Sequence, residues 1–254
     1  MKKLAFFMAT GVVALMAASC GGNVQQNASG EQSQETVEQN DTTGAQALLE
    51  AADKGDAEAQ LAYARLAQTT AMTDGPNYVT SEKYLKMAAE QGNSDAMWEL
   101  AIMYMMGYDG VGKNGDEAFK WAQQSADKDN PIGIYALAAC FDSGIGTAED
   151  EAKEDELFKK AFEALSKIEN PNVQQLRYLA HCYADGDGVA EDEAKAAELY
   201  RKAAEQGDAA SQARLGDCYR EGEGVAKDMT EATKWYDMAA KQGFPVDKQY
   251  CSKK

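Results

Sequence analysis

Apolar and small residues recur along this chain with the spacing of one helix face. Ala96, Leu100, Ala101 and Tyr104 stand at positions i, i+4, i+5 and i+8, which places them on one side of an α-helix. Three later segments repeat the spacing: Gly133, Leu137, Ala138 and Phe141; Gln175, Leu179, Ala180 and Tyr183; Ser211, Leu215, Gly216 and Tyr219. The small residues allow a neighbouring helix to approach closely. The pattern predicts a packed helix in each segment.

A second element follows each of these predicted helices. Residues 199–207 read LYRKAAEQG and residues 235–243 read WYDMAAKQG. Weaker copies bring the starting positions to 84, 121, 157, 199 and 235, in steps of 37, 36, 42 and 36 residues. A near-constant period of this length is typical of stacked helical repeats, in which one repeat cannot bury its apolar face alone.

Paired glycines separate the two predicted helices of a repeat. They stand at positions 144 and 146, 186 and 188, and 222 and 224, where they end the first helix and allow positive φ. We expect the second helix to begin after an N-cap residue, namely Asn114, Asp150, Asp192 or Asp228. The step of 42 predicts that the helix around 157–161 continues through residue 168 until Asn170 and Pro171 end it.

These residues resemble the Sel-one-like repeat family, a relative of the tetratricopeptide repeats. The resemblance covers residues 45–243 and is most specific in the last two repeats. It implies an α/α superhelix and an adaptor role in protein complexes. We therefore expect an all-α fold, a superhelical solenoid of five two-helix repeats. Residues 45–55 match only a second helix and are predicted to form an N-terminal capping helix, which brings the expected number of helices to eleven.

The start of the chain predicts export and a lipid anchor. Lys2 and Lys3 precede an apolar stretch, residues 4–18, which is too short to span a bilayer comfortably. Small residues at 17–19 then precede Cys20. This resembles the lipobox of bacterial lipoproteins, which implies cleavage before Cys20 and acylation of that residue. An ordinary cleaved signal peptide is the alternative.

The chain therefore divides into four predicted parts. Residues 1–19 are a lipoprotein signal peptide, residues 20–44 an acylated cysteine with a polar, disordered tether, residues 45–243 the solenoid, and residues 244–254 a C-terminal tail. The net charge of −17 argues against nucleic acid and against an anionic lipid surface as partners. It would steer a basic partner towards the chain, with ordinary solubility as the alternative.

The residues that could take part in catalysis or metal binding favour a structural role instead. The motif Ser125-x-x-Lys128 matches one motif of penicillin-interacting serine enzymes, but its companion motifs are absent. His181 is the only histidine and no Cys-x-x-Cys occurs, so we expect no metal and no cofactor. We predict that three cysteines are buried thiols and that Cys251 is more exposed: Cys140, Cys182 and Cys218 each precede the aromatic residue of a first helix.

The remaining candidate is a protein-binding surface. In solenoids of this kind the first helices line the concave face. The side of these helices opposite the predicted core carries the residues that we predict to bind a partner: Trp98, Ile102, Tyr135, Arg177, His181 and Asp217. Aromatic residues and arginine commonly anchor interfaces. The alternative is that Trp98 and Tyr135 pack under the long connection of the first repeat.

These observations predict a monomeric, membrane-tethered protein-interaction module of the cell envelope, facing the periplasm and without catalytic residues. Two alternatives belong to other classes. One is a hydrolase or penicillin-interacting enzyme of the cell wall, and the other is a structural lipoprotein without a single partner.

Overall fold

The computed structural model describes residues 44–69 and 76–252, which contain eleven α-helices and no strand. The first helix spans residues 44–53. Ten further helices form five hairpins, followed by a short 3-10 helix, η1 (Lys248–Tyr250). The hairpins are α3 (Ala57–Ala67) with α4 (Tyr78–Glu90), α5 (Ser94–Met106) with α6 (Gly115–Ala126), α7 (Pro131–Ser143) with α8 (Glu151–Ser166), α9 (Val173–Asp185) with α10 (Glu193–Glu205), and α11 (Ala209–Glu221) with α12 (Met229–Lys241).

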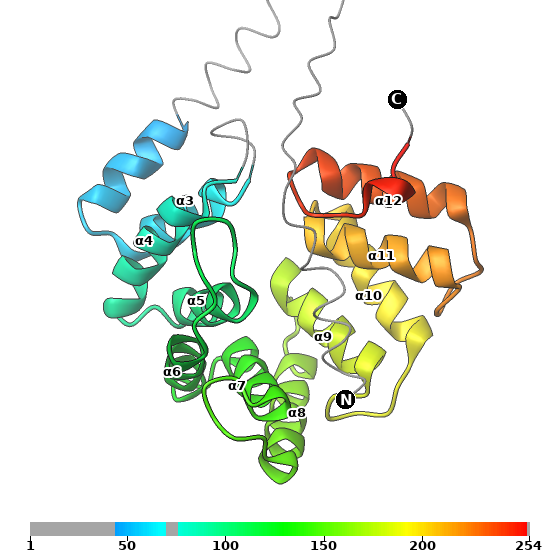
Figure 1. The fold of residues 1–254 in the computed structure, drawn as a ribbon, viewed down its shortest axis with the longest axis horizontal. Helices are drawn as coiled ribbons and strands as arrows, with labels where there is room; N and C mark the ends of the chain where they lie inside the picture. Colours follow the sequence, from blue (N-terminus) through cyan, green and yellow to red (C-terminus); the bar gives the residue numbers. More distant parts are fainter. Residues whose placement is uncertain (1–43, 70–75, 253–254) are drawn as a thin grey trace, which may run out of the picture.

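The hairpins stack in series into a curved superhelix (Figure 1). The first helices α5, α7 and α9 lie towards the inside of the curve, whereas α6 and α8 lie outside. The helix of residues 44–53 precedes α3 in one arm, and α12 ends the other arm. The predicted all-α superhelical solenoid with an N-terminal helix is therefore confirmed.

Local sequence signals set where the helices begin. Asn114, Asp150, Asp192 and Asp228 are the N-caps of α6, α8, α10 and α12, as predicted, and each side chain accepts a hydrogen bond from a backbone amide of the first turn. A cap of this kind contributes about 1 kcal/mol to helix stability.

The predicted glycine pairs have the backbone that the turn requires. Gly222 ends α11 with φ of 85°, and Gly224 follows with φ of 66°. A Cβ atom on Gly224 would lie 2.0 Å from the carbonyl oxygen of Glu193. The turn of the fifth repeat therefore packs directly on the start of α10, which leaves room only for glycine.

The first helix of the third repeat, α7, is buried on all sides. Ten residues of α7 are buried, because this helix contacts α5, α6, α8 and α9. A helix that is apolar all round is typical of such a position. The centre of the superhelix is therefore packed with side chains.

The connection between the third and fourth repeats differs from the prediction. The helix α8 ends at Ser166, two residues before the predicted end at residue 168, and residues 167–172 connect it to α9. Gln175 and Leu179, predicted for the core face of α9, are only half-buried, whereas Leu176 and Tyr178 are buried. Tyr178 belongs to the core shared with α7, and Leu176 to the core shared with α10. The helix α9 therefore contributes side chains to two cores.

Several predictions concern residues outside the described part of the chain. The signal peptide, Cys20 and the tether up to residue 43 are among them, as are residues 70–75 of the long first-repeat connection. Within the ranges that are described, no helix has both the length and the apolar character needed to cross a membrane.

Candidate interaction surface on the first helices

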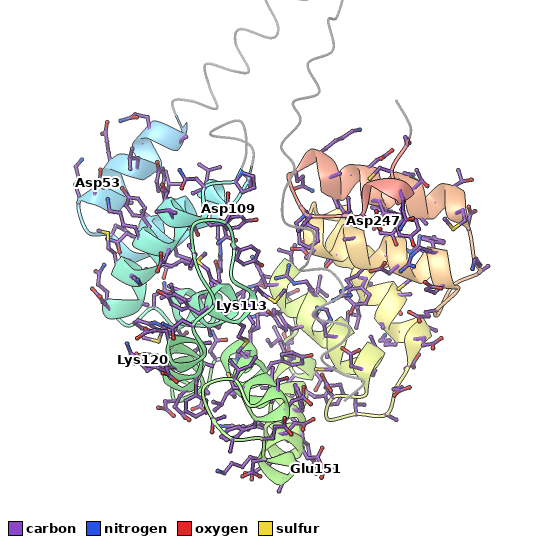
Figure 2. The ribbon with its side chains drawn as sticks, in the orientation of Figure 1. Asp53, Asp109, Lys113, Lys120, Glu151 and Asp247 are labelled. Carbon is purple, nitrogen blue, oxygen red and sulfur yellow. The ribbon has the colours of Figure 1, made fainter. Side chains whose placement is uncertain are left out.

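Basic residues are distributed unequally between the two helices of a repeat. The five first helices contain no lysine, and the lysines lie on second helices, in turns and near the termini. Four of the five arginines lie on first helices, namely on α3, α9 and α11, and the fifth, Arg201, lies on α10. Lys120 and Glu151 illustrate the outer side, where their side chains point away from the molecule (Figure 2). Arginine suits a surface of fixed ion pairs because its planar guanidinium group can donate two parallel hydrogen bonds to one carboxylate.

Arg65 joins the first two repeats through two carboxylates. Its Nε donates to Glu99 Oε1 at 2.6 Å, and its Nη2 lies 3.5 Å from Asp95 Oδ2. The Glu99 side chain is only 8% exposed. Burial raises the pKa of Glu99, although the Arg65 charge and hydrogen bond act in the opposite direction. This pair is therefore a partly buried link between α3 and α5.

Arg177 joins the fourth and fifth repeats. Its Nη1 donates to both carboxylate oxygens of Asp208, at 2.9 and 3.1 Å. Asp208 is also the N-cap of α11, so the ion pair holds α9 against the start of α11. Burial of Arg177 disfavours its charge, but Asp208 and the nearby Tyr178 and Tyr108 outweigh this effect and raise the pKa of the guanidinium group.

A third group lies on α11. Asp217 accepts from Arg220 at 3.0 Å and from the Tyr236 hydroxyl at 2.7 Å. Arg214 lies 3.9 Å from the same carboxylate. Arginine and carboxylate side chains of α3, α5, α9 and α11 therefore pair and neutralise one another. We call these residues the first-helix charge row: Arg65, Asp95, Glu99, Arg177, Asp208, Arg214, Asp217 and Arg220.

Aromatic rings fill the inside of the curve next to this row. The Trp98 ring of α5 meets the Tyr178 ring of α9 edge-on, with centroids 5.7 Å apart. Tyr135 of α7 contacts the same Tyr178 ring at 5.1 Å. His181 lies at the end of the cluster, where its Nδ1 is 2.9 Å from the Tyr200 hydroxyl. The second and fourth repeats thus touch across the inside of the curve.

A buried hydrogen bond fixes this central cluster. The Tyr135 hydroxyl donates to Asp187 Oδ2 at 2.7 Å, and both residues are almost inaccessible. Asp187 lies in the glycine turn after α9. Because the desolvated hydroxyl faces a carboxylate, the pKa of Tyr135 is well above its ordinary value. The bond therefore ties the turn of the fourth repeat to the third.

The structure brings some of the predicted binding residues together and separates others. Trp98, Tyr135 and His181 lie in the central cluster, with exposures of 4%, 1% and 5%. Trp98 and Tyr135 pack against Tyr178 of the fourth repeat. Ile102 is half-buried, and Arg177 and Asp217 are half-buried members of the charge row. A partner-binding role for these six residues stays a prediction.

Sequence reasoning did not single out three residues that shape this surface. Tyr178 holds the centre of the aromatic cluster, Glu99 forms the buried carboxylate beside Arg65, and Asp208 pairs with Arg177. The absence of lysine from the five first helices was one available signal. The apolar sequence of α7 on all its faces was another, because it indicates that no open groove passes the third repeat.

The candidate catalytic serine is part of the packing. Ser125 is fully buried, and its hydroxyl donates to the carbonyl oxygen of Ser94 at 2.8 Å. A side chain with this environment has no access to a substrate. In the part of the chain that the structure describes, no three His, Cys, Asp or Glu side chains are grouped so that they could hold a metal ion.

The three repeat cysteines, Cys140, Cys182 and Cys218, are buried thiols, as predicted. Burial raises the pKa of Cys140 and Cys218 to about 12 and also raises the pKa of Cys182. Because the thiolate is the reactive form, these positions are chemically inert. Cys251 is half-buried.

Several known proteins resemble the chain. Chitin synthase regulatory factor 1 of Schizosaccharomyces pombe is 29% identical over 84 residues, which are 33% of this chain and 18% of that protein. A Sel1 repeat protein from Oxalobacter formigenes is 31% identical with a TM-score of 0.44, over 76% of this chain and 54% of that one. A protective antigen of uropathogenic Escherichia coli strains is also 31% identical, with a TM-score of 0.43, over 76% of this chain and 40% of that one.

The chain spans less than a fifth of the length of that curated relative and about half of these two solved structures. The Sel1 repeat model matches residues 55–93, 94–130, 176–208 and 209–244, together more than half of the 254 residues. These segments correspond to the first, second, fourth and fifth hairpins. Proteins built from this repeat generally serve in protein–protein interaction. The chain belongs to the Sel1 repeat family.

Proposed function

We propose that this protein is a membrane-tethered interaction module of the bacterial cell envelope, facing the periplasm and binding a protein partner on its first helices. The tether rests on the sequence around Cys20, where small residues precede the cysteine after an apolar stretch. Several acyl chains on one residue give a stable anchor, because each buried methylene contributes about 0.8 kcal/mol.

The observation that carries the binding proposal is the first-helix charge row. The arginines and carboxylates of this row pair with one another. A partner therefore meets side chains that are already ordered. Preorganised groups lose little entropy on binding. Among the pairs of the first-helix charge row that link two repeats, Arg65 and Asp95 are the most accessible, with side chains 34% and 39% exposed.

Two experiments test this function separately. For the tether, cells receive an alkyne analogue of palmitate. We expect labelling and membrane fractionation of the natural chain, and loss of both with Cys20→Ser. Labelling that persists in this variant, or a natural chain found only in the soluble fraction, would contradict the anchor.

For the binding surface, the photoreactive residue p-benzoylphenylalanine replaces Asp95 in the full chain in cells. The matched control carries it in place of Glu163, which is exposed on α8. We expect a protein adduct from position 95 and none from position 163. Equal adducts from both positions, or none from position 95, would reject the first helices as the binding surface.

A further inference from the structure

The two ends of the solenoid are covered differently. Within the chain, each second helix receives the first helix of the next repeat on one face. On α10 this face includes Ala197 and Ala204, which are 1% and 0% exposed. The Gln212 side chain of α11 donates to the carbonyl oxygen of Ala204, and the Arg201 guanidinium of α10 donates to the Tyr219 hydroxyl of α11.

The first helix of the chain follows the same arrangement. The Gln60 side chain of α3 donates to the carbonyl oxygen of Ala52 at 3.0 Å, as Gln212 does to Ala204. The helix of residues 44–53 therefore covers α3 in the way that α10 covers α11. All five first helices of the chain thus have a preceding second helix as a neighbour.

In the described part of the chain, no α-helix lies on the same face of α12, although the 3-10 helix η1 contacts α12. Positions 36 residues after Ala197 and Ala204 are Thr233, which is half-buried, and Ala240, which is exposed. Met229 is 44% exposed, and Val79 is the one other large apolar side chain described as exposed. Methionine on an open surface adapts readily to the shape of a partner.

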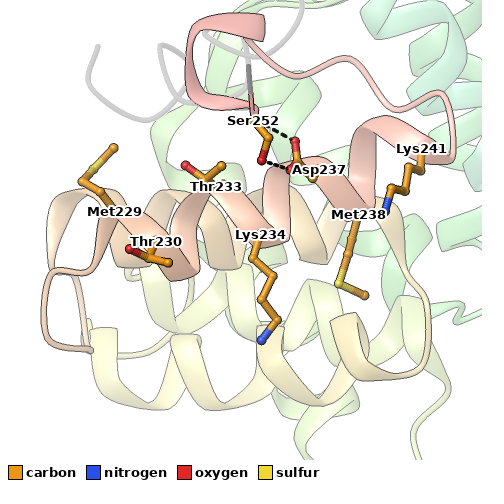
Figure 3. A pocket seen from close by; sticks show the side chains of 8 residues that line it. All are labelled: Met229, Thr230, Thr233, Lys234, Asp237, Met238, Lys241 and Ser252. Atoms are coloured by element: carbon orange, nitrogen blue, oxygen red, sulfur yellow. Dashed lines mark hydrogen bonds between the residues drawn. The ribbon is translucent and has the colours of Figure 1, made fainter. Parts of the chain in front are cut away.

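A groove of about 540 Å³ runs along this face. It includes Met229, Thr233 and Asp237, with Ser252 of the C-terminal segment at its edge (Figure 3). The Ser252 amide and hydroxyl both donate to the Asp237 carboxylate, at 3.0 and 2.5 Å. The C-terminal segment thus occupies the Asp237 carboxylate. The part of the face around Met229 and Thr233 stays open.

We propose that the outer face of α12 is a second docking surface, which receives an α-helix of another protein in the groove beside the C-terminal segment. The surface continues an interface that the chain forms between its own repeats. The occupant is an amphipathic helix with small residues on its contact side, because Thr233 and Ala240 allow close approach. Lys234 and Lys241 line the groove, so the helix carries acidic residues on its flank.

A second copy of this chain does not fit the groove in the same way. Its first helices are already covered by the preceding second helices, so it would have to unfold its N-terminal helix to offer one. The surface is also separate from the first-helix charge row, so its partner can differ from the partner proposed for that row.

Photo-cross-linking followed by direct binding tests this proposal. The full chain carries p-benzoylphenylalanine in place of Thr233 in cells, and the matched control carries it in place of Glu198, on the exposed side of α10. We expect an adduct from position 233 only, and mass spectrometry should locate it in a helical segment with acidic flanking residues. No adduct above the control, an adduct with a second copy, or one with a non-helical segment would overturn the proposal.

A synthetic peptide of the cross-linked segment then serves as the probe in fluorescence anisotropy. We expect Ala240→Arg to weaken its binding at least tenfold, because Ala240 is exposed on the same side of α12 as Thr233 and an arginine there blocks the close approach of a helix. We expect Asp95→Ala to leave the binding unchanged. Circular dichroism checks that both variants keep the helical content of the natural chain. Binding that is unchanged by Ala240→Arg would overturn the proposed site, whereas loss by Asp95→Ala alone would assign the peptide to the charge row.

Discussion

Mild acid should destabilise this protein through its single histidine. His181 is 5% exposed and lies 2.9 Å from the Tyr200 hydroxyl. Burial, together with the charges of Arg214 and Arg177, holds the pKa of the His181 side chain well below its ordinary value of 6.5. The folded protein therefore keeps this ring neutral at pH values where the unfolded chain binds a proton.

The sign and size of the effect follow from proton linkage. A base whose folded pKa is depressed contributes its full stability above the unfolded pKa and loses it as the pH falls below that value. For an unfolded pKa of 6.5, a change from pH 7 to pH 5.5 should lower the free energy of unfolding by about 1.2 kcal/mol. Glu99 acts in the opposite direction, because its folded pKa is raised.

The assay compares urea unfolding of the natural chain and of His181→Gln, at pH 7 and pH 5.5. Glutamine can accept the Tyr200 hydrogen bond, but it does not titrate. Carboxylates, Glu99 included, contribute equally to both proteins, so the difference between the two pH effects isolates the histidine. We expect the natural chain to lose about 1.2 kcal/mol more than the variant does. Equal losses in the two proteins would refute the reasoning.

Three further predictions concern packing. Tyr135→Phe removes a donor from a buried carboxylate and should lower the free energy of unfolding by about 1–3 kcal/mol, measured by urea denaturation. Gly224→Ala places a Cβ atom 2.0 Å from a backbone oxygen of α10 and should lower the melting temperature more than Gly222→Ala, whose Cβ atom has no neighbour closer than 3.4 Å. In a chain with Cys20→Ser, Ellman's reagent should titrate Cys251 in the folded state and the three repeat cysteines only after unfolding; rapid titration of all four thiols would contradict their burial.

The sequence was sufficient for the elements because each repeat carries its own local signals. The N-caps at Asp192 and Asp228 and the glycine pairs of the turns act within a few residues, so they are legible without the tertiary structure. The near-constant period of the repeats predicted that the hairpins stack in series. The one clear shift, in α9, follows a connection of different length, and no local pattern specifies how a helix rotates after such a connection.

The inner surface was harder to predict because it depends on curvature. A helical wheel places Trp98 and Tyr135 opposite the predicted core, but it contains no information on which repeats meet across the superhelix. The second and fourth repeats meet at Trp98 and Tyr178. Contacts between repeats that are not neighbours in sequence therefore bury residues that a single repeat would leave exposed.

This closed centre changes what the charge row can do. The Arg177 side chain is only 17% exposed and holds both oxygens of Asp208, and breaking a buried pair typically costs about 3–5 kcal/mol. Arg65 and Asp95 are about twice as exposed, and such pairs contribute about 0–1 kcal/mol. A partner carboxylate can therefore replace Asp95 far more readily than Asp208. Replacing a carboxylate of the row by one of the partner therefore costs the least free energy in the N-terminal arm. The packed centre maintains the curvature meanwhile. The proposed partner should thus bind without straightening the superhelix.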